Sequence, residues 1–177
     1  MFTALLDLVL PATCPGCRQA PAAALCPGCT TQLRTASPRQ VRPDPPPEGL
    51  PPCYGIGGYH GLLREVILGY KERGRYGLAA ELGDRLAAVV SAAVPGRRPV
   101  VLIPVPATSR AARQRRGDHM LRLARRAAGW HRSRGRPAYV LRAVRADPRP
   151  DSAGLTAAQR LAVAGTALRP RTGILAA

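Results

Sequence analysis

Apolar side chains recur at helical spacing in two consecutive stretches near the middle of the chain. The first stretch contains Leu62, Leu63, Val66, Ile67 and Tyr70, and the second contains Leu78, Leu82, Leu86, Val89 and Val90. Apolar residues three and four positions apart line one face of an α-helix. The pattern therefore predicts two amphipathic helices, joined by the segment KERGRYG.

Short apolar runs elsewhere indicate strands. The segment RPVVLIPVPATSR contains the continuous run VVLI between prolines. Such a run predicts a buried parallel strand whose carboxyl end opens into a loop, and ligands of open α/β sheets bind at such ends. CYGIGGYHG and PAYVLRAVR are further strand candidates.

Arginines alternate with apolar residues over 111–130, AARQRRGDHMLRLARRAAGW, and predict a helix with one buried stripe and one basic face. A short helix is expected near 156–164, and the first ten residues, MFTALLDLVL, predict an amphipathic helix. Residues 37–52 are rich in proline and indicate an extended linker. The expected domains are therefore 1–36, a linker over 37–52, and 53–177.

The charge of the chain points to an acidic partner. Lys and Arg number 27 against 10 Asp and Glu, a formal charge of +17 at pH 7, and such an excess is typical of proteins that bind nucleic acid or phosphorylated metabolites. A bias toward GC-rich coding is the alternative explanation, because nearly all of these residues are arginine. Lys71 is the exception, and its compact ammonium suits a phosphate.

The chain shows no secretory signal and no apolar run near the ~20 residues that span a bilayer. We therefore expect a cytoplasmic protein whose cysteines stay reduced.

Four of the five cysteines lie in two CPGC segments, at Cys14, Cys17, Cys26 and Cys29. Paired CxxC turns at this spacing are typical of a structural four-cysteine zinc site, in which no coordination position is left open for catalysis. Two disulfides, or a redox CxxC, are the alternatives; the expected compartment disfavours the first and the doubled motif the second. Cys53 is expected to be a small buried apolar residue.

Five segments in this order resemble the ComF family of phosphoribosyltransferase-like proteins, which act in bacterial DNA uptake and recombination. They are LLDLVLPATCPGC, the second CPGC, GLLREVILGYKERGR, VVLIPVPATSRAARQRRG and AGLTAAQR. The resemblance implies an α/β fold, a type I phosphoribosyltransferase-like parallel sheet with flanking helices, preceded by a small N-terminal four-cysteine zinc module.

The resemblance also implies a set of phosphate-binding residues. Lys71, Arg73 and Gly74 match a KYRG-like turn of the family, and residues 103–106 with Arg110, Arg113, Arg116 and Gly117 match its PVP strand end and RG motif. These groups would hold phosphate or pyrophosphate through charge-assisted hydrogen bonds. Asp118 and His119 stand where the family usually has Phe-Asn, and we expect Asp118 to cap or flank a helix.

The ribose-phosphate loop of the family, which has two adjacent acidic residues, has no match in the chain. We therefore expect the fold to be C-terminally incomplete. We also expect Mg²⁺ and phosphoribosyl pyrophosphate to bind only to a completed fold. Strands left unpaired would favour self-association.

Three functions follow as hypotheses. The first is a ComF-like protein of competence that binds single-stranded DNA or a helicase partner; aromatic residues make up only 4% of the chain, so DNA contacts should run through phosphates. The second is a phosphoribosyltransferase. The third is a zinc-stabilised interaction fragment whose arginines form a solvated surface. His60, His119 and His131 are expected to be surface groups or hydrogen-bonded core groups.

Overall fold

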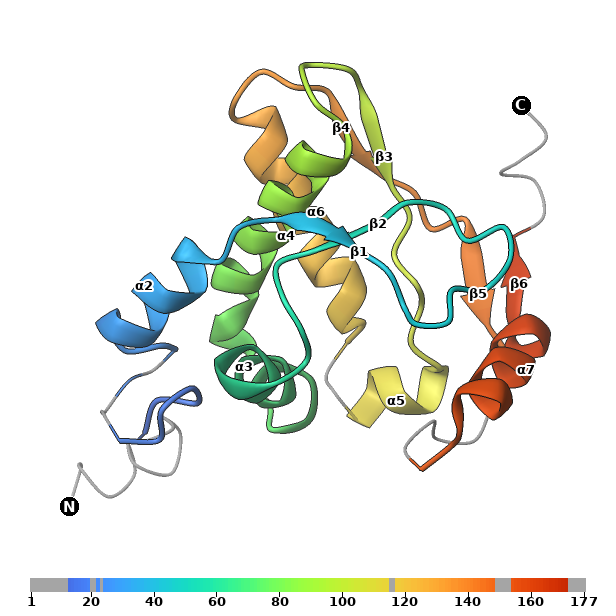
Figure 1. Cartoon of the computed structure of the whole chain (residues 1–177), viewed down its shortest axis with the longest axis horizontal. Helices are drawn as coiled ribbons and strands as arrows, with labels where there is room; N and C mark the ends of the chain where they lie inside the picture. Colours follow the sequence, from blue (N-terminus) through green and yellow to red (C-terminus); the bar gives the residue numbers. More distant parts are fainter. Residues whose placement is uncertain (1–12, 20–21, 23, 115–116, 149–153, 172–177) are drawn as a thin grey trace.

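Figure 1 shows the computed structural model of the chain, which describes residues 13–171 except 20–21, 23, 115–116 and 149–153. The helix predicted over the first ten residues lies outside this part. The elements are α2 (Pro27–Thr35), β1 (Arg39–Val41), β2 (Cys53–Gly55), α3 (Gly61–Glu72), the 3-10 turn η1 (Tyr76–Leu78), α4 (Ala79–Ala93), β3 (Val100–Leu102), α5 (Ser109–Gln114), α6 (His119–Arg132), β4 (Ala138–Val140), β5 (Val144–Ala146), α7 (Ala157–Ala167) and β6 (Leu168–Pro170). None of the helices so described is long and apolar enough to cross a membrane.

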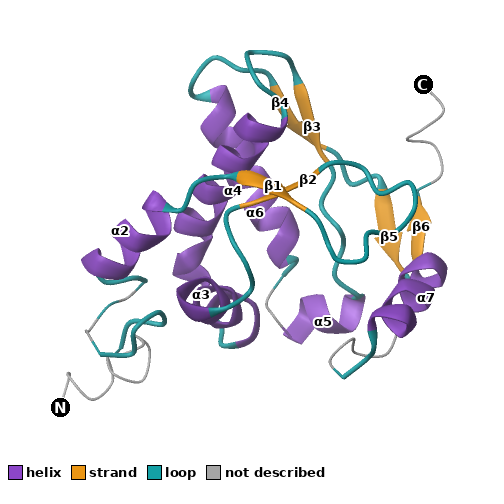
Figure 2. Ribbon diagram, in the orientation of Figure 1, coloured by secondary structure: helices purple, strands orange, loops and turns teal. Residues whose placement is uncertain are grey.

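Helices α3, α4 and α6 form the centre of the molecule, as Figures 1 and 2 show. The predicted helices at 62–70 and 78–90 are confirmed as α3 and α4. Helix α4 approaches α6 so closely that a Cβ atom added at Gly83 would lie 2.3 Å from Cγ of Arg126. Several of the buried side chains on these two helices are small, among them Ala87, Ala124 and Ala127, and small side chains let two backbones pack closely.

A larger apolar cluster lies where α3 meets the N-terminal part of the chain. Its buried members are Leu33, Val66, Tyr70, Leu78 and Leu82. Leu33 comes from α2, so the helix that contains Cys29 contributes directly to the core of the body. The cysteine-rich module and the helical body therefore share one apolar core rather than being joined only by a linker.

The strands form three separate pairs instead of one continuous sheet. β1 pairs with β2 antiparallel, β3 pairs with β4 parallel, and β5 pairs with β6 antiparallel. Helices and small sheets are thus both present, but the parallel sheet of a type I phosphoribosyltransferase is not confirmed. The parallel β3–β4 pair, with α5 and α6 between its strands, is the part that agrees with the expectation.

β3 is a parallel strand as predicted, but the VVLI run is buried only in part. Val100 packs with Ala128 of α6 and Ala138 of β4, but Val101 is 53% and Ile103 51% exposed. Helices cover only one face of this two-stranded sheet, so alternate side chains of β3 and its following loop face outward.

In two other segments the secondary structure differs from the prediction. Residues 39–41 of the proline-rich linker pair with β2, in the register Arg39 to Gly55. The long basic helix is split into α5 and α6, with Gly117 at a φ of 126° between them. Asp118 caps α6 by accepting hydrogen bonds from the backbone N–H groups of Met120 and Leu121, at 3.0 and 3.1 Å, which confirms its expected capping role.

A matched pair of valine substitutions tests the position of the core. Val66 is fully buried and Val101 is 53% exposed. Val66→Ala should lower the free energy of unfolding by about 2 kcal/mol, because buried methyl groups are lost and a cavity is left. Val101→Ala should cost less than about 1 kcal/mol. Urea denaturation of both variants measures the difference, and equal losses would contradict this assignment of the core.

Candidate functional site

The four cysteines of the two CPGC segments converge on one point. The sulfur atoms of Cys14, Cys17, Cys26 and Cys29 all lie within 4.8 Å of one another. Cys14 and Cys29 are buried. Four thiols at this separation can hold one metal ion, and a structural zinc ion is compatible with the ligand set and the tight turns.

The local sequence explains why the thiols meet. Each cysteine pair begins a tight turn, closed by backbone hydrogen bonds from Arg18 to Cys14 and from Thr30 to Cys26, both 2.9 Å. A Cβ atom at position 16 would lie 2.9 Å from Sγ of Cys29 and 2.5 Å from Cδ1 of Leu62. Only glycine allows this approach, so Gly16 sets the distance between the two turns.

Two of the thiols have perturbed pKa values of opposite sign. Burial acts to raise the pKa of Cys14, but the backbone N–H groups of Cys26, Cys17 and Gly16 outweigh it and lower the pKa to about 6. Burial, and then sharing of protons with the neighbouring sulfurs, raises the pKa of Cys29 to about 12. The cluster thus contains donors aimed at a thiolate, which is the form that binds metal.

Glu65 of α3 joins the metal centre to the helical body. Its carboxylate accepts hydrogen bonds from Arg18 at 2.5 Å, Arg64 at 2.8 Å and Arg73 at 2.8 Å. Arg18 directly follows Cys17, whereas Arg73 follows the end of α3. The hydrogen bonds from Arg73 and Arg18 lower the pKa of Glu65 to about 2. This carboxylate therefore stays ionised and connects three segments at neutral pH.

Further contacts hold the module in place. Pro15 packs against Gly69 of α3, where an added Cβ would lie 3.2 Å from the proline ring. The Arg75 guanidinium donates to the carbonyl of Thr13, and Arg34 of α2 forms an ion pair with Glu81 of α4 at 2.9 Å. The metal centre is therefore fixed to α3 and α4 through both apolar and charged contacts.

The residues predicted to bind phosphate near the end of α3 already have partners. Lys71 lies 3.2 Å from the carboxylate of Glu72, and Arg73 is one of the three arginines on Glu65. Gly74 has a φ of 67°, the left-handed conformation that the turn after α3 requires. The two cations of this turn are thus held by neighbouring carboxylates.

The structure places this turn beside the start of α6, where the second predicted phosphate segment ends. The Tyr70 hydroxyl donates to the carbonyl of His119 at 2.9 Å, and the Arg122 guanidinium lies 5.0 Å from the centre of the Tyr76 ring. Gly117 lies just before α6, and a Cβ atom added to it would lie 3.3 Å from Nη2 of Arg122. The sequence singled out Tyr70 only as an apolar helix position and did not single out Tyr76, although the two tyrosines flank the KERGR motif.

The remaining predicted residues are less well defined. Arg113 is exposed on α5, whereas Arg116 and the side chain of Arg110 lie outside the described part of the chain. His131 is buried, and burial, together with the nearby charge of Arg136, lowers its pKa. Cys53 is half-buried and donates to the carbonyl of Pro51 at 3.3 Å.

Comparison of the chain with protein-family models, with curated proteins and with solved structures found no match.

The metal centre is tested by elemental analysis of the purified protein. We expect about one zinc ion per chain, as four thiolates complete one tetrahedral site. Cys29→Ser should lose most of the metal and lower the melting temperature, because the buried thiolates then lack a common ion. Cys53→Ser is the matched control and should keep the metal. Full zinc content in Cys29→Ser would contradict the assignment.

The Glu65 ion pairs predict a pH dependence of stability. Folding lowers the pKa of Glu65 from 4.5 to about 2. The contribution of Glu65 to the free energy of unfolding is therefore complete above the pKa of the unfolded state, and it is lost as the pH falls toward the pKa of the folded state. Glu65→Gln should therefore be less stable than the wild type at pH 7, and the difference should shrink from pH 4.5 to about 2. Glu48→Gln, in the exposed linker, is the control. Thermal unfolding at several pH values measures both, and a pH-independent difference for Glu65→Gln would count against these ion pairs.

Proposed function

We propose that the chain is a cytoplasmic, ComF-like protein whose zinc-stabilised module and basic body bind single-stranded DNA through its phosphates, in DNA uptake or recombination. The proposal combines the resemblance of five ordered segments with the four-cysteine centre and the charge of +17. A helicase of the competence machinery is a further partner within this proposal.

The observation that best supports the proposal is which charged side chains form ion pairs and which do not. Among the described residues, every carboxylate except Asp44 and Glu48 is engaged in an ion pair or a helix cap. Several exposed arginines in the same part of the chain form no ion pair with another described residue: Arg39, Arg42, Arg98, Arg113, Arg125 and Arg142. This surplus of positive charge is available for phosphates, which match the guanidinium fork.

A phosphoribosyltransferase activity is the second candidate. The parallel β3–β4 pair supports it, because the loop IPVP leaves the carboxyl end of β3 as in the resembled fold. In this candidate Lys71 and Arg116 would steady a pyrophosphate leaving group, and Mg²⁺ would supply charge stabilisation when bound. The ion pairs of Lys71 and Arg73 weaken it, since both cations would have to leave their carboxylates. Phosphoribosyl pyrophosphate that raises the melting temperature only with Mg²⁺ present would favour it.

An interaction fragment is the third candidate, supported by exposed apolar side chains on and beside the β3–β4 pair. Self-association through this sheet would then bury Val101, Ile103 and Tyr139. Sedimentation that stays monomeric at high protein concentration would count against it.

DNA binding is tested by its dependence on salt. The logarithm of the binding constant for a thymidine single strand should fall linearly with the logarithm of salt concentration, with a slope of about −0.7 per neutralised phosphate. Replacing Arg113 and Arg125 by alanine should reduce the magnitude of that slope by about 1.4 if each arginine neutralises one phosphate. Replacing both by lysine keeps the charge and should keep the slope. Fluorescence anisotropy measures the affinities, and an affinity unchanged by salt would overturn the proposal.

A further inference from the structure

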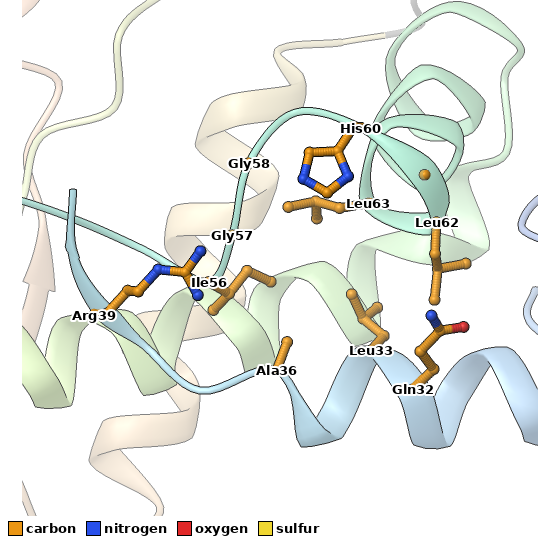
Figure 3. A pocket seen from close by; sticks show the side chains of 11 residues that line it. Gln32, Leu33, Ala36, Arg39, Ile56, Gly57, Gly58, His60, Leu62 and Leu63 are labelled. Atoms are coloured by element: carbon orange, nitrogen blue, oxygen red, sulfur yellow. The ribbon is translucent and has the colours of Figure 1, made fainter. Parts of the chain in front are cut away.

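A groove lies where the cysteine-rich module meets the helical body, away from the segments predicted to bind phosphate. It has a volume of about 320 Å³ and is lined by α2 and its C-cap residue Ala36, the first residue of β1, the glycine-rich turn after β2, and the start of α3. Figure 3 shows it from close by. This volume is at the small end of the roughly 300–1,000 Å³ typical of ligand pockets, so the groove suits one small ring system.

The floor of the groove is apolar and firmly held. Leu33 belongs to the buried core, and Ile56, Leu62 and Leu63 pack against the same cluster. Leu62 also touches the metal-binding turn at Gly16. The floor therefore depends on the cysteine module being in place, and it offers a dry surface to a flat apolar ring.

The rim carries polar groups of three kinds. Gln32 has an amide that both donates and accepts hydrogen bonds, His60 has an exposed aromatic ring, and Arg39 has an exposed guanidinium without an ion pair to another described residue. Figure 3 shows the His60 ring above Leu63, with Arg39 and Gln32 toward opposite ends of the groove. No carboxylate is among the lining residues.

The glycine-rich turn leaves room for a ring beside it. Gly57 and Gly58 form one side of the groove, and a Cβ atom at position 58 would lie 2.8 Å from the His60 ring. Side chains at these positions would narrow the groove or push His60 aside. The glycines thus keep the backbone side of the groove open.

We infer that this groove binds one unstacked base of a single DNA strand, with Arg39 on the adjoining phosphate. An apolar floor, an aromatic ring, an amide and a cation without a nearby carboxylate together match a nucleotide, whose base has apolar faces and a polar edge. A single base site is consistent with the scarcity of aromatic residues. This inference rests on the proposed function and assigns a base-binding site to it.

The test compares two strands of equal charge on the full, zinc-loaded chain. One is a single strand of about twelve thymidines, and the other is the same sugar-phosphate chain with every base removed. The thymidine strand should bind about tenfold more tightly, because only it places a base in the groove. Ala36→Leu fills the groove from α2 and should remove this preference. Ala93→Leu, at the exposed end of α4, should keep it.

A second variant pair guards against misfolding of Ala36→Leu. Arg39→Ala should weaken binding of the thymidine strand more than that of the base-free strand, because its phosphate contact depends on the seated base. Arg42→Ala, on the neighbouring linker, should weaken both strands equally. Binding of free thymidine monophosphate, measured in parallel, separates a strand from a free nucleotide as the ligand.

The outcomes distinguish this inference from the function on which it rests. Equal affinity of the two strands for the wild-type chain overturns the base site but leaves phosphate binding intact. Binding of free thymidine monophosphate without a preference for the thymidine strand overturns the assignment to DNA. Failure of both strands to bind at low salt overturns the proposed function and the base site together.

Discussion

The contact that most of the structure depends on is the carboxylate of Glu65 with its three arginines. Arg18 comes from the metal-binding turn, and Arg73 from the turn after α3, so one side chain joins segments that lie far apart in the sequence. The Glu65 side chain is 17% exposed, whereas those of Arg18 and Arg73 are 66% and 40% exposed, so water screens these ion pairs in part. Without them the cysteine module would be attached to α3 mainly by Leu33, Leu62 and Pro15.

The metal centre and the helical core are consequently parts of one unit. Gly16 touches both a cysteine sulfur and Leu62, and Leu62 packs against the cluster that contains Val66 and Leu78. An ion held by the four thiols would order the two cysteine-containing turns, and these turns support one side of the core. Metal binding and folding should thus be strongly linked.

The described arginines divide into those that face carboxylates and those that do not. Arginines that face carboxylates, such as Arg34 on Glu81 and Arg126 on Asp84, tie helices together. No ion pair to another described residue is formed by Arg39, Arg42, Arg113 or Arg125, which are all exposed. The count of 27 basic residues therefore overstates the basic surface, because some of these charges are neutralised in ion pairs.

The sequence by itself determined the local features of this protein. Helical periodicity placed α3 and α4, the doubled CPGC placed the metal ligands, and Asp118 was recognisable as a helix cap, because each depends on spacing within a few residues. Only the tertiary structure decided that the Glu65 carboxylate joins Arg18 to Arg73, that Val101 and Ile103 are exposed, and that Gln32, Arg39 and His60 line one groove. These properties arise from contacts between distant segments, which the packing of the whole chain selects and local patterns do not contain.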